Sequence, residues 1–387
     1  MKANVTWSIE EDAKLAGKTC AKKAVLDLVQ TKVAIMFSSV KYNTQELLNG
    51  AKEVLGTAPI IGCTSNEGII VPDGFINSKT GFVGMMALGD NETNVGTAGS
   101  KKLITARETG KYVAKKAMEK VGTICSPSYF LMIANPGEEE EYAKGIQDVI
   151  GDVPFFGGSS ADDDLSGKWQ IYTEEGIFDK GVAVAFFYTN KEIKNIFTGK
   201  YHETVNSGVI TKITGKRQLD EIDGIQALKR YCEWTNKKTK DVKGIKLLTE
   251  SILKPLAVKS PAGDFTVIRH PMNGNTDCTI NLGNDLSVNT AIIQMQASKQ
   301  EMISAPAITL RELKSKLNGQ PVAYLMIHCG GRKMAIEDSV ENLAKKVKQE
   351  AGDVPFIMPF TFGEYGRGEH TANLCGGLMI SETAFCK

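Results

Sequence analysis

The segment YFLMIANPGEEEEYAKGIQDVIGDVPFFGGSSADD, from Tyr129 to Asp163, contains one complete structural unit. It opens with a short unbroken apolar run, which is typical of a buried strand. Tyr142, Ile146 and Ile150 then recur at helical spacing and form one apolar stripe. A second apolar run, led by a proline, ends in glycines, hydroxyls and acids. The segment therefore predicts a strand, a helix, a second strand and a polar loop.

The same pattern occurs twice more along the chain. The runs VAIMFSS (33–39) and APIIGCTSNEG (58–68) form the first copy, and AYLMIHC (323–329) and VPFIMPFTFGEYG (354–366) form the third. Another apolar run follows each polar loop: GFVGMMAL from 81, GVAVAFF from 181 and GGLMIS from 376. Because short apolar strands joined through a helix are typical of buried sheets, we expect an α/β fold. Its repeated β-α-β-loop-β units should form mixed sheets flanked by helices.

Glycine and proline mark the same two places in every copy. A glycine stands where each helix should end in a residue with positive φ, and a proline precedes each second strand, where a missing N–H is least harmful. The glycines are Gly56, Gly151 and Gly352, and the prolines are Pro59, Pro154 and Pro355.

A different kind of segment lies between the second and third copies. LDEIDGIQALKRYCEWTN (219–236) predicts a helix, and residues 255–296 predict an antiparallel β meander with Gly, Asn and Asp turns. A chain of 387 residues is long for one core, so we expect two domains. The expected division is an N-terminal extension (1–29), a first domain with two units (30–221) and a second domain with the helix, the inserted meander and the third unit (222–387).

The composition excludes several classes of partner. Lys plus Arg (46) almost balances Asp plus Glu (45), so no basic surface for nucleic acid or anionic lipid is predicted. The N-terminus has no apolar signal region, and no apolar run approaches the length of a membrane span, which predicts a cytoplasmic protein without membrane insertion. The eight cysteines show no C-x-x-C pair and the Gly-rich turns lack G-K-[ST], so we expect reduced thiols and no metal or other cofactor.

The polar loops after the second strand of each unit are the candidate binding site. Ligands of open α/β sheets bind at the carboxyl ends of strands, and the loops of equivalent units should lie on one side. Solvent-exposed turns are the alternative explanation of these loops. The candidates are Cys63, Thr64, Ser65 and Glu67 in the first loop; Gly158, Ser159, Ser160 and Asp162 in the second; and Thr361, Gly363 and Glu364 in the third.

Two arginines at the ends of apolar strands could bind a carboxylate. Arg269 lies in FTVIRHP, where a buried guanidinium needs a carboxylate or a ligand as partner, and a structural ion pair is the alternative. Arg332 follows the strand end that carries Cys329. Both cations are therefore candidate ligand-binding residues.

Five motifs in this order resemble the FIST proteins, which pair an N-terminal and a C-terminal FIST domain. The motifs are IIGCTSNEG, FFGGSSADD with GVAVAFF, PLAV with FTVIRHP, HCGGR, and FTFGEYG with HTAN, and the resemblance spans roughly residues 30 to 380. It departs from the family where isoleucine often follows the GE pair and this chain has Tyr365. The residues that match the family motifs are Gly62, Thr64, Ser65, Gly158, Ser159, Arg269, Cys329, Arg332, Gly363 and Glu364.

The resemblance implies a sensory module that binds small ligands such as amino acids. Such modules are often fused to signalling output domains, and no output domain is recognised here, so we expect a separate signalling protein as partner. In the leading hypothesis, the ligand is an amino acid or another carboxylate. Arg269 or Arg332 would bind its carboxylate, and Glu364 or Asp162 its ammonium or hydroxyl group.

Two other functions remain open from the sequence. A thiol-dependent enzyme would use Cys63 or Cys329 as nucleophile with His328 or His370 as base. Some relatives of the resembled family are associated with haem and nitric-oxide sensing, so a haem-based gas sensor using His270 or His202 is the other alternative.

Overall fold

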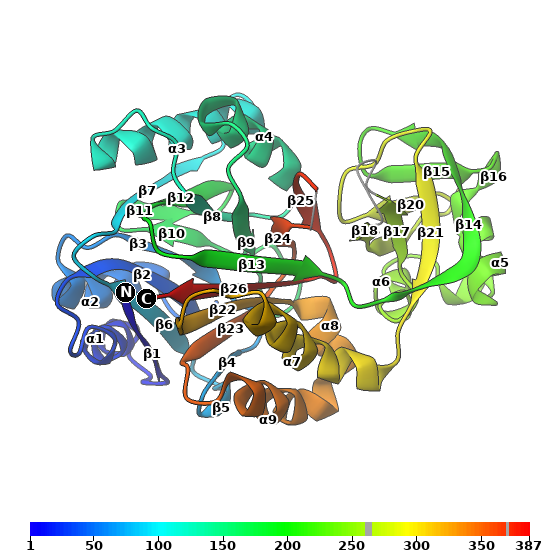
Figure 1. The fold of residues 1–387 in the computed structure, drawn as a ribbon. Coiled ribbons are helices and arrows are strands. Elements are labelled where there is room, and N and C mark those ends of the chain that lie inside the picture. The colour runs from blue at the N-terminus through cyan, green and yellow to red at the C-terminus, as the bar shows by residue number, and fades with distance from the viewer. Residues whose placement is uncertain (260–264, 369–370) are drawn as a thin grey trace.

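Three interlocked sheets form the body of the molecule, and a smaller β-rich insertion lies beside it (Figure 1). The structure is a computed structural model that describes residues 1–259, 265–368 and 371–387. The N- and C-termini lie next to each other on the side of the body away from the insertion. The sequence-based prediction of mixed α/β sheets flanked by helices is confirmed.

The body repeats one order of elements three times: edge strand, helix, strand, helix, strand, hairpin, strand. The first unit has β1 (Lys2–Ser8), α1 (Ala13–Ala24), β2 (Thr31–Ser38), α2 (Thr44–Leu55), β3 (Ile60–Thr64), the hairpin β4 (Ile69–Val71) and β5 (Gly74–Ile76), and β6 (Val83–Gly89). The second has β7 (Asn94–Lys101), α3 (Ala106–Val121), β8 (Tyr129–Ala134), α4 (Glu139–Ile150), β9 (Phe155–Ser159), the hairpin β10 (Ile171–Thr173) and β11 (Gly176–Phe178), and β12 (Gly181–Tyr188).

The third unit begins before the insertion and resumes after it. It has β13 (Ile193–Thr198), α7 (Lys299–Ser315), β22 (Pro321–Cys329), α8 (Gly330–Ala335), the short helix η2 (Glu337–Ser339), α9 (Val340–Ala351), β23 (Phe356–Thr361), the hairpin β24 (Glu364–Arg367) and β25 (Asn373–Gly376), and β26 (Ile380–Cys386). The sequence did not predict the edge strands β1, β7 and β13 or the helices α1 and α3. These elements complete each unit, because β1 pairs with β6, β7 with β12 and β13 with β26.

Local sequence signals account for the central strands and helices. The two strands of each predicted β-α-β segment pair in parallel, as β2–β3, β8–β9 and β22–β23. The helices α2, α4 and α9 end at the three predicted glycines, which have φ of +59°, +75° and +64°. The carbonyl of each predicted proline accepts a hydrogen bond from the first strand of the parallel pair in its unit, β2, β8 or β22, at 2.9–3.2 Å.

Each unit donates its hairpin to the sheet of another unit. β4 pairs with β23, β10 pairs with β3, and β24 pairs with β9, so the exchange runs once around the three units. The sheet orders are β1-β6-β2-β3-β10-β11, β25-β24-β9-β8-β12-β7 and β13-β26-β22-β23-β4-β5. Because each hairpin directly follows a polar loop, the exchange carries the loops of all three units toward one another.

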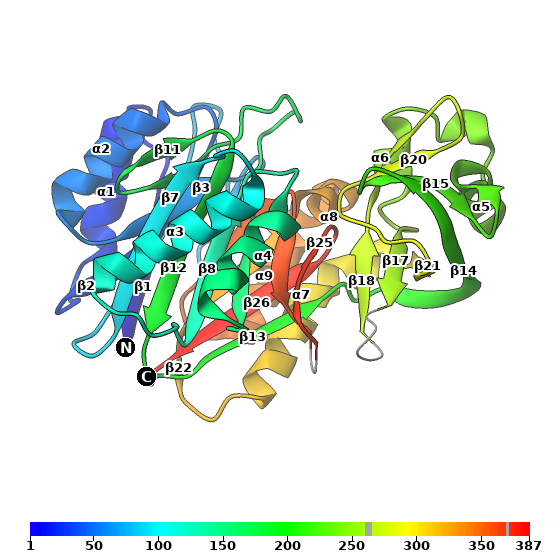
Figure 2. The ribbon, with the colours of Figure 1, turned by 90° about the horizontal axis from the view of Figure 1, so that it is seen from above.

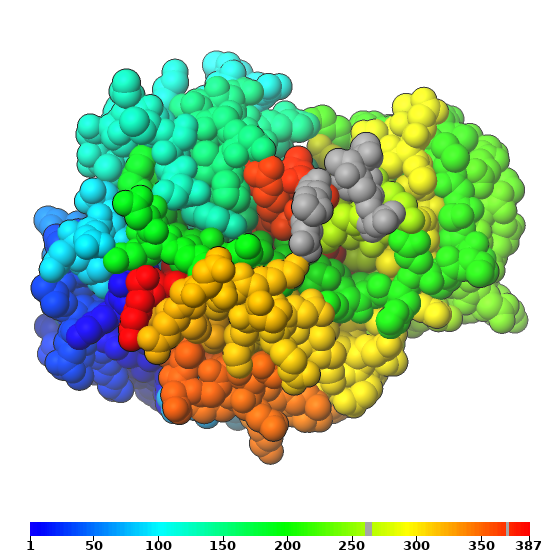
Figure 3. All heavy atoms as spheres, in the orientation of Figure 1, coloured from blue at the N-terminus to red at the C-terminus, as the bar shows by residue number. Residues whose placement is uncertain are grey.

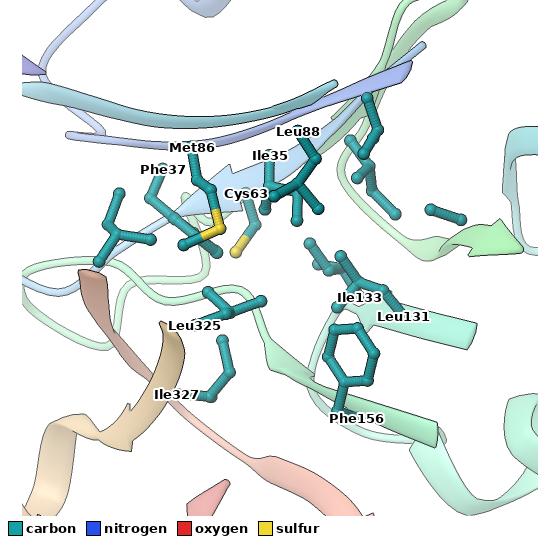
Figure 4. Close-up of a cluster of buried hydrophobic side chains, with 14 of the residues drawn as sticks. Ile35, Phe37, Cys63, Met86, Leu88, Leu131, Ile133, Phe156, Leu325 and Ile327 are labelled. Atoms are coloured by element: carbon teal, nitrogen blue, oxygen red, sulfur yellow. The ribbon is translucent and has the colours of Figure 1, made fainter. Parts of the chain in front are cut away.

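The central core lies where the three sheets face each other (Figure 4). Phe37 and Cys63 from the first sheet, Phe156 from the second and Leu325 and Ile327 from the third meet there, and all are buried. The helices cover the outer faces, with α1 and α2 on the first sheet, α3 and α4 on the second, and α7 and α9 on the third. Figure 2 shows this arrangement from above.

The insertion extends from β14 to β21 and is built on one antiparallel sheet of eight strands. Its elements are β14 (His202–Thr214), β15 (Gln218–Ile222), β16 (Ile225–Gln226), α5 (Ala227–Thr235), η1 (Thr239–Asp241), α6 (Lys246–Glu250), β17 (Leu256–Lys259), β18 (Thr266–Arg269), β19 (Pro271–Gly274), β20 (Ile280–Leu282) and β21 (Ala291–Gln296). The predicted meander is therefore present, although residues 260–264 lie outside the described ranges. The helix predicted over 219–236 is wrong in its first part, because residues 218–222 pair with β14 as a strand.

Candidate functional site

The three polar loops meet at one end of the body. The amide of Asn66 in the first loop donates to the carbonyl of Phe360 in the third at 2.9 Å, and its side chain donates to the carbonyl of Asp162 in the second at 2.8 Å. The second and third loops are joined by the amide of Ser159, which donates to the carbonyl of Gly363 at 2.8 Å. The strand ends therefore converge, as expected for equivalent units in one body.

A cavity of about 460 Å³ lies between these loops and the insertion. In the space-filling view, the insertion packs directly beside the body (Figure 3). The body contributes residues from all three loops, from the start of α4 and from the turn after β22, and the insertion contributes residues of α6, β19 and β20 and their neighbours. The lining residues are Asn66, Pro136, Gly137, Glu139, Asp163, Asp164, Leu165, Trp169, Cys329, Gly330, Gly331, Met334, Phe362, Gly377 and Leu378 from the body, and Arg217, Leu248, His270, Met272, Leu282, Gly283 and Asn284 from the insertion.

Among the residues that the sequence predicts to bind a ligand, Cys329 lines this cavity. Most of the other loop candidates are buried one layer deeper, and several of them join the loops to each other. Thr64 accepts a hydrogen bond from the amide of Gln170 at 2.9 Å, and the Ser65 hydroxyl accepts one from the amide of Phe360 at 2.9 Å. Cys63 lies in the central core (Figure 4).

The second-loop candidates shape the segment that reaches the cavity. The Asp162 carboxylate accepts hydrogen bonds from the amides of Leu165, Gly167 and Lys168 at 2.7–2.9 Å, which folds the loop back on itself. Ser159 bonds Tyr365, whose hydroxyl lies 2.5 Å from the serine Oγ. Gly158 pairs with Glu364, and the Ser160 hydroxyl accepts a hydrogen bond from Asn135 at 2.9 Å.

The third-loop candidates form a buried polar group behind the cavity. Glu364 accepts hydrogen bonds from the Thr361 hydroxyl at 3.0 Å and from the amide of Met379 at 2.9 Å. Burial raises the pKa of its carboxyl group to about 8, although these hydrogen bonds oppose the shift. Unlike these buried groups, Glu67 of the first loop is partly exposed and forms an ion pair with Lys333 at 2.7 Å.

Both predicted arginines are buried and bonded to backbone carbonyls. Arg269 donates to the carbonyls of Asp285 and Cys375, each at 3.0 Å, and burial lowers its pKa. Arg332 donates to the carbonyls of Gly199 at 2.7 Å and Leu378 at 3.2 Å. Neither arginine is among the residues that line the cavity.

Arg217 of the insertion is the cation that faces the cavity, and it binds three carboxylates. Its Nη2 lies 2.6 Å from Glu139 Oε2 and 2.7 Å from Glu140 Oε2, and its Nε lies 3.1 Å from Asp285 Oδ1. Burial alone would lower the pKa of Arg217, but the two glutamates raise it above its usual value. This ion-pair cluster fastens the insertion to the start of α4.

The described histidines named in the enzyme and haem alternatives differ in burial: His270 and His328 are buried, and His202 is exposed. His270 lines the cavity, its Nε2 lies 2.9 Å from the carbonyl of Leu248, and burial lowers its pKa to about 4. Since a carbonyl only accepts, the neutral ring carries its proton on Nε2. His328 is buried behind Cys329, and burial lowers its pKa to about 3. His202 is exposed beside Glu301, and His370 lies outside the described residues.

Burial also controls the thiols named in the enzyme alternative. It raises the pKa of Cys63 and that of Cys329 above the ordinary value, and the Glu364 carboxyl adds to the shift at Cys329. Both sulfurs are therefore protonated thiols at neutral pH, which are poor nucleophiles.

Three of the nine described non-glycine residues with positive φ lie at or next to the cavity wall. Glu67, Leu165 and Leu378 have φ of +49°, +59° and +55°, and none of them is glycine. Such conformations persist where surrounding contacts enforce them, and they recur at binding sites. Here Asp162 enforces the turn at Leu165, and Arg332 binds the carbonyl of Leu378.

Sequence reasoning missed most of the cavity wall. Trp169 lies beyond the predicted part of its loop, and Arg217, Met272 and Asn284 come from the insertion, whose placement against the loops no local pattern shows. One signal was available in the four consecutive glutamates 138–141, because acids packed at one helix start need a cation nearby.

Two further features concern metals and membranes. Across residues 1–259, 265–368 and 371–387, no group of three or more His, Cys, Asp or Glu side chains is placed to hold a metal ion. Within the same ranges, no helix combines the length and the apolar character that crossing a bilayer requires.

The fold and cavity describe a repeated α/β protein with a ligand-sized space under an inserted β domain. Comparison with known families then identifies it: the FIST N domain matches residues 32–225 and the FIST C domain matches residues 227–367, so the chain belongs to the FIST family. FIST domains are small-ligand-binding sensory domains of signalling proteins.

The other comparisons do not show the fold or the function of this chain. Among the curated proteins, none is similar enough to match this chain. Two solved structures from Thermotoga maritima align with it, PurLQS (9% identity, 100% of this chain and 73% of that chain) and phosphoribosylformylglycinamidine synthase II (10% identity, 100% and 72%). The TM-score is 0.22 for each, which is too low to support a shared fold.

Proposed function

We propose that this chain is a cytoplasmic sensory protein that binds a small molecule in the cavity between its three-sheet body and its insertion, and that it signals through a separate protein partner. The main support for the proposal is that the residues lining the cavity come from both the body and the insertion. All three strand-end loops of the body and three elements of the insertion contribute to one space of about 460 Å³. A volume of this size suits a small ligand.

The connection between the body and the insertion suggests how binding could be transmitted. Residues 199–201 lead into the insertion, and residues 297–298 lead out of it. Arg332 donates to the carbonyl of Gly199 and follows Gly330 and Gly331, which line the cavity. A ligand that contacts Gly330 and Gly331 at the start of α8 could therefore shift Arg332 and, through its hydrogen bond, the segment that leads into the insertion. The proposed signal is a change in the position of the insertion.

An amino acid remains a candidate ligand, but its contacts differ from those first expected. Arg269 and Arg332 donate to carbonyls, so Arg217 is the cation left in the wall, and a ligand carboxylate would have to compete for it with Glu139, Glu140 and Asp285. The ammonium group would approach Glu139, Asp163 or Asp164. The deeper loop residues are proposed to support the wall, and the ligand contacts predicted for them from the sequence stay predictions.

A thermal-shift screen over amino acids, amines and organic acids tests the proposal. A ligand present at a hundred times its dissociation constant should stabilise the protein by about 2.7 kcal/mol. Met334, which lines the cavity and is 44% exposed, can be replaced by tryptophan to fill the space. Met334→Trp should abolish the shift.

The matched control is Leu103→Trp, because Leu103 is 47% exposed and is not part of the cavity wall. It should leave the shift unchanged. A screen without any stabilising compound, or a ligand whose shift survives Met334→Trp, would refute the proposed site.

A further inference from the structure

The charges and rings of the cavity wall indicate which class of small molecule fits it. Of the charged side chains in this wall, Glu139, Asp163 and Asp164 are acids and Arg217 is the base. The guanidinium of Arg217 already contacts Glu139, Glu140 and Asp285 at 2.6–3.1 Å. Its charge is therefore neutralised within the protein by acids that include Glu139, and Asp163 and Asp164 are the acids of the wall that Arg217 does not pair.

His270 does not change this balance. Its Nε2 proton is directed to the carbonyl of Leu248, and burial keeps the ring neutral at physiological pH. Asp163 is held by the amide of Glu67 at 2.9 Å, and Lys41 lies 3.7 Å from its other oxygen at the outer side. Asp164 is exposed, so its carboxylate is accessible at the entrance of the cavity.

Two aromatic rings form a corner in the same wall. The centroids of Trp169 and Phe362 lie 5.9 Å apart, and the ring planes meet at 89°. At this separation and angle the edge of one ring meets the face of the other, and the ring faces that stay uncovered at such a pair attract organic cations. Trp169 belongs to the loop that carries Asp163 and Asp164, so acids and rings lie on one segment of the chain.

Most of the other large side chains in the wall are apolar. Met272, Leu248 and Leu282 of the insertion and Met334 and Leu378 of the body all line the cavity. Leu165 and Met334 remain 41% and 44% exposed, which leaves apolar surface uncovered at the entrance. An apolar ligand body would cover this surface and gain the free energy of its burial.

We infer that the ligand is an organic cation, an amine or alkylated ammonium compound with an apolar or aromatic body. Its charged nitrogen binds in the corner of Trp169 and Phe362 beside Asp163 and Asp164, and its body lies against the methionines and leucines. This inference rests on the proposed binding site and specifies the ligand class. An isolated organic acid would meet the carboxylates of Asp163 and Asp164, and Arg217, the cation of this wall, is already bound by acids.

Three compounds of matched shape test the inference by calorimetry on the full chain. They are 2-phenylethylamine as the cation, 2-phenylethanol as the neutral analogue and 3-phenylpropionate as the anion. The amine should bind about tenfold more tightly than the alcohol, from one carboxylate contact and one ring contact, and the acid should bind more weakly than the alcohol. Raising NaCl from 50 to 500 mM should weaken the binding of the amine and leave the binding of the alcohol unchanged, because salt screens exposed charges.

Variants locate the cation. Asp164→Asn and Trp169→Leu should each weaken the amine by roughly threefold to thirtyfold without changing the affinity for the alcohol. Asp179→Asn, which alters an exposed acid outside the cavity wall, should change neither affinity.

Failure of the inference differs from failure of the proposed site. Equal or tighter binding of the acid, or an amine affinity that is unchanged in both Asp164→Asn and Trp169→Leu, overturns the cation assignment while the cavity remains a binding site. The cation assignment is also overturned if none of the three probes binds, while the wider thermal-shift screen finds a ligand whose binding is abolished by Met334→Trp. If the wider screen yields nothing, the binding site itself is refuted.

Discussion

Glu382 is a carboxyl group in the core of the third sheet, and its replacement should stabilise the protein. The side chain is fully buried, and neither carboxyl oxygen has a hydrogen-bond partner among the described residues. By register, the same strand position holds Met85 in the first unit and Val184 in the second, since each faces a methionine of the neighbouring strand. The third unit therefore carries an acid where the others carry apolar side chains.

The sign and size of the effect follow from the burial. Burial raises the pKa of Glu382 well above its usual 4.5. Above pH 4.5 the unfolded chain loses this proton while the folded chain keeps it, so stability falls as pH rises toward the folded-state pKa. The slope has an upper limit of about 1.4 kcal/mol per pH unit. Replacing the unpaired polar group with an apolar one should itself raise the free energy of unfolding by about 1–3 kcal/mol.

Urea unfolding at pH 5, 6.5 and 8 measures the effect. Glu382→Gln imitates the protonated acid, so it should match the wild type at pH 5 and exceed it increasingly up to pH 8. Glu382→Met should raise the free energy of unfolding by about 1–3 kcal/mol already at pH 5. Glu337→Gln, at an exposed acid, is the control and should show no pH-dependent difference.

The opposite result has a clear meaning. Arg332 is also fully buried, and its Nε and Nη2 have no hydrogen-bond partner among the described residues. If Glu382→Gln is less stable than the wild type at pH 8, the carboxylate is ionised in the fold and is stabilised by the charges of Lys200 and Arg332. The reasoning from an unpaired neutral acid would then be wrong.

Three further predictions concern packing, the ion-pair cluster and the thiols. Gly145→Ala should lower the free energy of unfolding by about 1–3 kcal/mol, because the new Cβ would lie 2.0 Å from a carbonyl of the facing helix α3; Gly176→Ala, whose nearest neighbour would lie at 3.8 Å, should be neutral in the same urea titration. Arg217→Gln should destabilise the protein by roughly 2 kcal/mol or more and accelerate amide exchange in β15, because it leaves carboxylates of α4 without their cation; unchanged exchange would show that the cluster does not hold the insertion. Iodoacetamide at pH 7.5 should modify the exposed Cys125 well before Cys329, as followed by mass spectrometry, and the reverse order would favour the thiol-enzyme alternative.

The sequence predicts the inner part of each unit well because its signals are local. The apolar runs, the helical stripe through Tyr142 and Ile146, and the positions of Gly151 and Pro154 all lie within one segment of 35 residues. The edge strand β7 was missed for the same reason, because its sequence NVGTAGSK has few large apolar residues and becomes a strand by pairing with β12.

The binding residues were harder to predict because polarity after a strand has two explanations. Asp162 and Ser65 follow strand ends as a ligand-binding residue would, yet their hydrogen bonds join one loop to itself or to its neighbours. Trp169 and Arg217 carry no motif, and only the fold places them in one wall. The ligand roles assigned to the loop residues from sequence stay predictions.

Taken alone, the sequence determined the repeated unit, the α/β class and the family, since each rests on residue types and short spacings. Tertiary structure decided which hairpin joins which sheet, where the insertion packs and which side chains face the cavity. These depend on contacts such as Phe360 with Ser65, which are 295 positions apart in the chain. Such pairs form because they bury apolar faces and satisfy backbone groups together, and that outcome is a property of the whole packed molecule.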